Sequence, residues 1–178
     1  MDRVPIAPQP TLEPNSRFDY VIVGAGLTGL TTALLLARSG AEVAVVEARR
    51  IGAVTTGNTT AKLSLLQSTQ VSKLRKRHSA DIVRRYVDAN REGQQWLLRY
   101  CDEHGVATQK QAAVTYAQSE SATGQVRREY EACKEAGLEV EWVEHLDVAF
   151  ENHGAVRLAD QAQFDPMAVL AAMTEDAL

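Results

Sequence analysis

The sequence is poor in cysteine, and it has no long apolar run. Its two cysteines, Cys101 and Cys133, lie far apart and form no C-x-x-C pair. Such sparse usage favours a reducing compartment and argues against a disulfide framework. The histidines show no ligand spacing, which disfavours a metal centre. Apolar runs fall short of the roughly 20 residues that a membrane-spanning helix needs. We therefore expect a cytoplasmic protein with no bound metal and no membrane partner.

The charge balance excludes another class of partner. The 178 residues carry a net charge of −4, which gives no general reason to expect nucleic acid. Positive charge is concentrated only in Lys73–His78, and no aromatic residues are interleaved there. That pattern is typical of a solvated helix end rather than of a single-strand binding surface. The length is enough for one domain, or for one domain and part of another.

One stretch carries a clear functional pattern. Phe18–Val23 is a short β-branched and aromatic run, typical of a strand covered on both faces. A glycine turn follows, then a helix predicted over Leu27–Ser39 and a second strand predicted over Val43–Val46. Glu47 stands at the end of that second strand. This order predicts an α/β fold with a parallel, Rossmann-like sheet.

The glycines have the G-x-G-x-x-G spacing of a dinucleotide-binding turn. Gly24 permits the tight turn, Gly26 leaves room for a pyrophosphate, and Gly29 allows close packing of helix and strand. The free N–H groups and positive end of the helix would face the phosphates. Glu47 can accept hydrogen bonds from an adenosine ribose and would repel a 2′-phosphate. A glycine-rich turn in some unrelated α/β protein is the less favoured alternative.

A threonine-rich segment follows Glu47. Gly52 and Gly57 interrupt regular structure there, and Thr59 and Thr60 precede Ala61–Leu63 as hydroxyl caps would precede a helix. A helix beginning here would give a second anion-binding surface. From the residues alone, a mobile threonine-rich loop is an equally good interpretation.

The remaining chain alternates between helical and strand patterns. Ser79–His104 predicts a long amphipathic helix whose apolar face is formed by Ile82, Tyr86, Ala89, Gly93, Trp96, Leu97 and Tyr100. Beyond it we expect strands around Ala113–Ala117, Leu138–Trp142 and Ala155–Ala159, a helix over Ser121–Ala136, and a last helix from Asp165–Pro166 to Leu178. This order suggests a second, smaller β-rich lobe.

These patterns predict a domain organisation. Residues 1–17 are proline-rich, lack the apolar segment of a secretory signal, and are expected to form a disordered arm. Residues 18–105 are expected to form the nucleotide-binding portion, 106–164 a partial second lobe, and 165–178 a last helix. Because two βα units do not complete a doubly wound sheet, we expect the chain to be the N-terminal part of a longer protein.

The same residues resemble a known group. VIVGAGLTGLTTALLLARSGAEVAVVE is similar to the N-terminal FAD fingerprint of flavin-dependent oxidoreductases. GNTTAKLS and QFDPMAVLAAM resemble the glycine oxidase and D-amino acid oxidase family, and TTGNTTAKLS is most similar to members with a C-terminal Rieske iron–sulfur domain. The resemblance implies FAD as cofactor, held by the Rossmann-like portion 18–105. It also implies that 106–164 is part of an antiparallel α+β substrate lobe and that the helix 165–178 returns to the FAD domain.

The resemblance also implies roles for individual residues. It places the FAD pyrophosphate on the turn formed by Gly24, Ala25, Gly26, Leu27, Thr28 and Gly29. The adenosine ribose would be held by Glu47 with Ala48 and Arg49 beside it. Four further residues, Thr59, Thr60, Ala61 and Lys62, would lie along the pyrophosphate and the approach to the flavin.

The implied chemistry is oxidation of an amine or amino acid, in which a hydride leaves the α-carbon for the flavin and water hydrolyses the resulting imine. No catalytic residue can be placed on this stretch, and no Rieske ligand set occurs in it, so an iron–sulfur domain would lie downstream. Three alternatives remain open: another flavoprotein, such as a monooxygenase or disulfide reductase; an NAD-dependent oxidoreductase; and a non-catalytic nucleotide-binding fragment.

Overall fold

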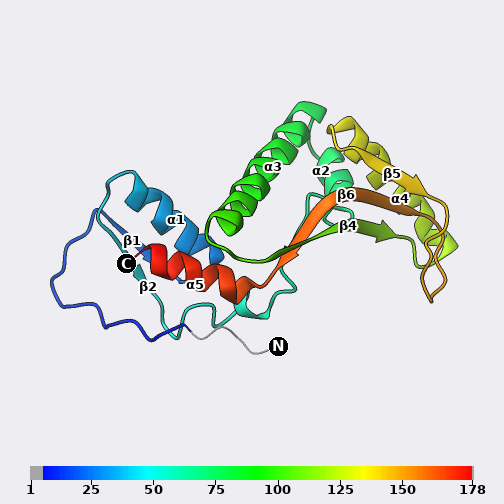
Figure 1. Cartoon of the computed structure of the whole chain (residues 1–178). Helices are drawn as coiled ribbons and strands as arrows, with labels where there is room; N and C mark the ends of the chain where they lie inside the picture. The colour runs from blue at the N-terminus through cyan, green and yellow to red at the C-terminus, as the bar shows by residue number, and fades with distance from the viewer. Residues whose placement is uncertain (1–5, 178) are drawn as a thin grey trace. The chain divides into compact units, whose positions relative to one another are not determined.

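The computed structural model describes residues 6–177 of the chain (Figure 1). Residues 1–5 of the predicted arm and Leu178 of the predicted last helix lie outside the described residues. The chain forms two compact units. Of the described residues, unit 1 comprises 6–61, Cys101–Ala107 and 164–177, and unit 2 comprises Lys62–Tyr100 and Thr108–Gln163. The domain organisation proposed from the sequence stays a prediction.

Unit 1 is built on a parallel β-α-β element. Strand β1 (Tyr20–Val23) leads through the glycine turn into α1 (Leu27–Arg38), and β2 (Val43–Val46) returns beside β1. The strands are paired in register from Tyr20 with Val43 to Val23 with Val46. These elements confirm the strand, helix and strand predicted for this stretch, because each depends on local pattern alone.

The expectation that β1 is covered on both faces is wrong for the described residues. Val23 is 85% exposed and Val21 is 55% exposed. Within residues 6–177 the sheet of unit 1 has only β1 and β2, so β1 has a hydrogen-bonded neighbour on one edge alone. Its β-branched composition is that of a strand in a larger parallel sheet.

Two helices and an arm complete unit 1. Helix α5 (Pro166–Asp176) packs against α1, and its first turn is capped as predicted, since Asp165 Oδ1 accepts a hydrogen bond from the Met167 N–H at 2.8 Å. A short 3₁₀ turn, η1, occupies Thr56–Asn58. Residues 6–17 of the predicted arm contain no helix or strand and lead into β1 (Figure 1).

Unit 2 is an antiparallel sheet covered by helices. Its strands are β3 (Lys62–Leu63), β4 (Thr108–Tyr116), β5 (Val140–Val143) and β6 (Ala155–Phe164). β6 lies between β3 and β4 and also pairs with β5, with Lys62 opposite Gln163 and Val140 opposite Leu158. The antiparallel β-rich lobe that the sequence predicts is confirmed.

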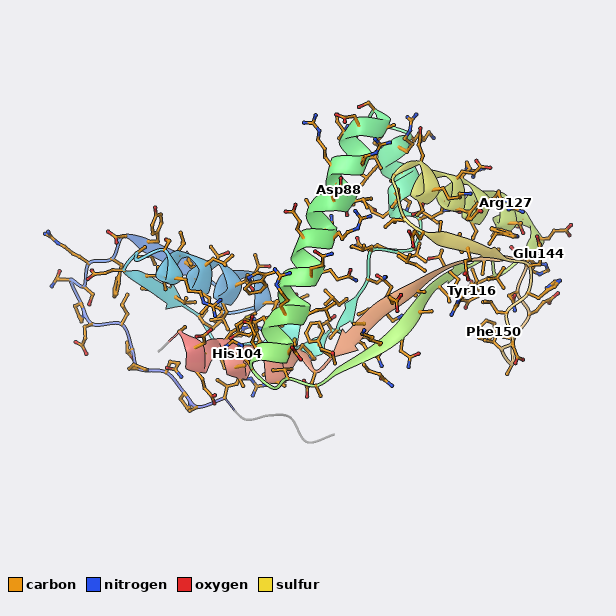
Figure 2. The ribbon with its side chains drawn as sticks, turned by 45° about the horizontal axis from the view of Figure 1, so that its top comes forward. Asp88, His104, Tyr116, Arg127, Glu144 and Phe150 are labelled. Atoms are coloured by element: carbon orange, nitrogen blue, oxygen red, sulfur yellow. The ribbon has the colours of Figure 1, made fainter. Side chains whose placement is uncertain are left out.

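The helices of unit 2 are α2 (Gln70–Arg75), α4 (Glu120–Glu135) and most of α3 (Ala80–Glu103). The predicted ends of α3 and α4 are confirmed, because Gly105 and Gly137 both adopt the positive φ of a helix terminator, at 65° and 84°. Arg127, in the middle of α4, contacts Glu144 at 3.9 Å, and the rings of Tyr116 and Phe150 pair with centroids 5.1 Å apart (Figure 2).

The predicted apolar face of α3 is correct in its second half and wrong in its first. Leu97 and Tyr100 are buried as predicted. Ile82, predicted to be in the core, is 52% exposed, whereas Val83 and Val87 are buried in the core cluster of unit 2. The buried face also includes a polar residue, Gln94. Its amide donates to the Leu63 carbonyl at 3.0 Å and to Gln161 Oε1 at 2.9 Å, so burial costs it no hydrogen bond.

A buried acid holds α2 in place. Glu129 of α4 is 0% exposed, and its carboxylate accepts from the Val71 N–H at 3.0 Å and the Ser72 N–H at 2.8 Å. These N–H groups belong to the first turn of α2, where no intrahelical acceptor exists. The Cys133 thiol also donates to Glu129, and burial beside this carboxylate raises the pKa of the thiol far above its usual range. Cys133 is thus a structural thiol, as its isolated position predicts.

We expect Glu129→Gln to lower the free energy of unfolding of unit 2 by about 2 kcal/mol, because an amide leaves one buried N–H without an acceptor. Urea unfolding followed by tryptophan fluorescence measures this, since Trp96 and Trp142 both lie in unit 2. Glu131→Gln, on the exposed face of the same helix, is the matched control and should change little. Equal stabilities of the two variants would contradict the capping role.

Candidate dinucleotide-binding site

The glycine turn has the backbone geometry that its sequence predicts. Gly24 adopts a φ of 103°, and its N–H donates to the Val46 carbonyl at 2.8 Å, which fastens the turn to β2. A side chain at this φ would be strained, and the space beside the Gly24 Cα is open. The turn therefore presents bare backbone toward that space.

Gly29 is required by close packing and not by its backbone angles. A Cβ at this position would lie 1.9 Å from the Gly24 carbonyl oxygen and 3.1 Å from its carbon. The first turn of α1 thus rests directly on the backbone of the glycine turn. This confirms the close helix-to-strand packing that the third glycine of the motif predicts.

The N-terminus of α1 lacks a cap from its own Ncap residue. Gly26 is that residue, and no acidic side chain lies in the first helical turn. The Leu27 N–H instead donates to the hydroxyl oxygen of Thr56 at 3.1 Å, and a Cβ at Gly26 would lie 3.0 Å from the same oxygen. Sequence reasoning missed Thr56, and its only signal is a threonine directly before Gly57.

The loop after Glu47 is built around the glycine turn. The Gly52 N–H donates to the Ala25 carbonyl, and the Gly57 N–H donates to the Gly52 carbonyl, each at 3.0 Å. Gly52 has a φ of 69° and packs so tightly that a Cβ would lie 2.7 Å from Leu170 Cδ1. The hydrogen bonds of these two glycines place the loop so that the Thr56 hydroxyl lies at the start of α1.

Glu47 joins the end of β2 to the glycine turn. One carboxylate oxygen accepts from the Ala25 N–H at 3.0 Å, and the other accepts from the Arg49 N–H at 2.9 Å. These hydrogen bonds, the one from Ala25 first, lower the pKa of Glu47, so the group is charged at neutral pH. The side chain is exposed, and each oxygen keeps a lone pair for a further donor.

The possible helix start at Thr59 and Thr60 is wrong. The 3₁₀ turn η1 ends at Asn58, and β3 begins at Lys62 with no helix between them. Thr59 accepts from the Ala61 N–H at 3.2 Å, and Ala61 takes a left-handed φ of 47° that no helix permits. Lys62 is the first residue of β3 and pairs with Gln163. Pairing with this distant strand therefore outweighs the local helix-capping pattern.

The structure brings together some of the residues implied by the family resemblance. The turn from Gly24 to Gly29, Glu47 and the Arg49 backbone form one hydrogen-bonded group. Ala48 follows Glu47 on the surface. Within residues 6–177 no hydrogen bond links Thr59, Thr60 or Ala61 to that group.

These features together suit an adenine dinucleotide. The helix N-terminus and the open backbone attract an anion, and the anchored carboxylate can accept from a diol. A pocket of about 900 Å³ adjoins Glu47. In the described part of the chain no three His, Cys, Asp or Glu side chains gather as a metal site would require. None of the described helices has the length and apolar character needed to cross a membrane.

Comparison with protein families gives one match across most of the chain. The model of the family described as DAO, FAD dependent oxidoreductase, matches residues 19–178. Among curated proteins, YhfW of Bacillus subtilis (strain 168), which carries the name of a Rieske 2Fe-2S iron–sulfur protein, is 29% identical over 93% of this chain. Gamma-glutamylputrescine oxidoreductase of Escherichia coli (strain K12) is 37% identical over 44% of it. This chain spans 33% and 18% of the lengths of these two relatives.

Solved structures show the same fold. An L-amino acid deaminase from Proteus vulgaris superposes with a TM-score of 0.71 at 17% identity, covering 97% of this chain and 45% of that protein. A glycine oxidase from Geobacillus kaustophilus gives a TM-score of 0.66 at 18% identity, covering 90% of this chain and 44% of that protein.

Proposed function

This chain belongs to the DAO family of FAD-dependent oxidoreductases, and from that membership we propose that its glycine turn and Glu47 hold the ADP half of FAD. The observation that carries the proposal is the exposed Glu47 carboxylate, anchored on the Ala25 N–H at the end of β2. A fixed, charged acceptor beside the N-terminus of α1 matches a ribose diol next to a pyrophosphate.

The chain's own residues would divide the binding task. Gly24 and Gly26 admit the pyrophosphate to the backbone, and the positive end of α1 stabilises its charge. Thr56 accepts from Leu27, and its hydroxyl hydrogen remains available to donate to a phosphate oxygen. The remaining turn residues of this proposal are Ala25, Leu27, Thr28 and Gly29, with Ala48 and Arg49 beside the ribose.

We assign Thr59, Thr60, Ala61 and Lys62 to the path toward the flavin, as the family resemblance implies. The left-handed φ of Ala61, 47°, supports a special role for this segment, because strained non-glycine residues cluster at functional sites.

The proposed reaction of the whole protein is oxidation of an amine or amino acid. FAD supplies the two-electron oxidation when bound, and the residues of this chain orient the cofactor. The names of the relatives support an amine-type substrate, and the likeness to YhfW supports an iron–sulfur domain elsewhere in the protein. Sparse cysteine supports the cytoplasm as its location.

Titration of the purified chain with FAD, followed by flavin fluorescence, tests the proposal. We expect saturable binding, and we expect Glu47→Arg to weaken it about tenfold or more, because the ribose loses its charged acceptor. Glu42→Arg is the matched control, since it reverses a charge before β2 without touching the turn. Binding of NAD in place of FAD, or equal affinity in both variants, would refute the assignment.

The pH dependence of wild-type binding gives a second check. Since the N–H groups of Ala25 and Arg49 lower the pKa of Glu47, its carboxylate stays charged below the usual glutamate value of about 4.3. The contribution of Glu47 should therefore hold from neutral pH down past that value. It should be lost only as the pH falls through the lowered pKa.

A further inference from the structure

The pocket beside Glu47 has a second wall that comes from the N-terminal arm. It measures about 900 Å³ and is lined by Val45–Glu47 and Arg49–Gly52, and also by Ile6–Glu13 of the arm. This volume lies within the range of small-molecule and cofactor sites, about 300–1,000 Å³. All of these residues belong to unit 1. The pocket is therefore a feature of one compact unit.

Residues 6–17, the described part of the arm, make no hydrogen bond to the rest of unit 1. Their hydrogen bonds are internal: Gln9 Nε2 donates to the Ala7 carbonyl at 3.2 Å, and Ser16 donates to the Glu13 carbonyl at 2.8 Å. Leu12 remains 47% exposed although it lines the pocket. A ligand bound in this pocket would therefore pack against the apolar side chains of the arm.

The composition of the arm fits a flat, largely apolar ligand. Between Ile6 and Leu12 there is no charged side chain, and two of the seven positions, Pro8 and Pro10, are proline. Proline has no N–H to pair with a strand and restricts the backbone, so such a segment presents side chains and not a hydrogen-bonding edge. The charge in the pocket comes from Glu13 of the arm and from Glu47, Arg49 and Arg50 after β2.

We infer that residues 6–12 form the outer wall of the adenosine site, with the adenine ring packed between the arm and the end of β2. This inference rests on the proposed FAD site and adds to it a segment that belongs to neither the glycine turn nor β2. Glu47 would hold the ribose, while Ile6 and Leu12 cover the base. The ligand class that the wall recognises is an adenine nucleotide, whether or not a flavin is attached.

Titration of the full 178-residue chain with FAD and with ADP tests this wall. We expect the double variant Ile6→Ser, Leu12→Ser to bind both ligands about tenfold more weakly, because two apolar contacts with the base are lost. Arg17→Ser alters the same arm outside the pocket lining and should leave both affinities unchanged. Leu12→Met keeps the apolar contact and should also bind normally.

Limited trypsin digestion supplies a readout independent of affinity. Cleavage after Arg17 should slow several-fold when ADP packs the arm, and the slowing should be lost in the double variant. Cleavage within Lys73–Arg77 of unit 2 serves as the internal control and should not respond to ADP. Products identified by mass distinguish the two sites.

The outcomes separate this inference from the proposed function. If the wild-type chain binds neither FAD nor ADP, the FAD site itself is refuted and the wall with it. If the wild type binds and Glu47→Arg weakens binding, but the double variant binds normally and the arm gains no protection, the wall alone is refuted. Thermal unfolding of the double variant should match the wild type, since residues 6–17 donate no hydrogen bond to the rest of unit 1. Weaker binding that appears only with a lowered Tm would also overturn the wall.

Discussion

Gly29→Ala is expected to destabilise the β-α-β element of unit 1 by at least about 3 kcal/mol. The added Cβ would lie 1.9 Å from the Gly24 carbonyl oxygen, and that oxygen belongs to the backbone, which cannot rotate away as a side chain would. Either α1 must move off β1 or the glycine turn must open. Both changes would also disturb the N-terminus of α1 at Leu27, which the proposed pyrophosphate site uses.

Hydrogen exchange of the α1 amides is the appropriate measurement, because both tryptophans lie in unit 2 and would not report on this helix. Gly93→Ala is the matched control. It places the same methyl group in the middle of α3, where no atom outside the adjacent backbone of the helix lies within 4 Å, and should stabilise that helix by about 1 kcal/mol. Unchanged exchange in α1 of Gly29→Ala would show that the close contact is not needed.

The elements that the sequence predicts correctly are those specified by neighbouring residues. The strand, turn and helix around Gly24 follow from hydrophobic pattern and glycine spacing within one short stretch, and the Asp165 cap needs only the residue two positions later. Such features depend on contacts that are local in the chain. Pattern reasoning reaches them without knowledge of the fold.

The errors occur where distant residues decide the outcome. Thr59 and Thr60 have the composition of helix caps, but β3 is formed because Lys62 pairs with Gln163, about a hundred positions later. The core face of α3 depends on the cluster that receives Val83 and Val87. Helical spacing limits the choice of face, and the packing partner fixes it.

Two side chains that cap helices were missed for the same reason. Thr56 reaches the Leu27 N–H because the Gly52 N–H binds the Ala25 carbonyl, a fold of the loop that no motif encodes. In the sequence, Glu129 is one of several charged residues on an amphipathic helix. In the structure it caps α2, although it lies 57 residues beyond Ser72. Side chains that bind backbone groups distant in sequence leave no periodic signal.

Gly26→Val is expected to reduce FAD affinity about 100-fold or more while unit 1 stays folded. Position 26 has a φ of −93° and extended backbone, which valine adopts readily, and its Cβ would lie 3.0 Å from the Thr56 hydroxyl, which must shift by a few tenths of an ångström. The isopropyl group would instead fill the space proposed for the pyrophosphate. Fluorescence titration with FAD measures the loss, and circular dichroism checks the fold.

A variant that weakens the same helix elsewhere separates binding from stability. Gly40→Ala lies just beyond the far end of α1, at a φ of 92° with open space around it, so it strains the backbone without approaching the proposed site. Gly40→Ala should lower the Tm and leave FAD affinity unchanged. Gly26→Val should lower FAD affinity and leave the protein folded. If Gly26→Val bound FAD like the wild type, the pyrophosphate could not lie against the Gly26 backbone, and the glycine turn would have only the structural role that Gly29 already shows.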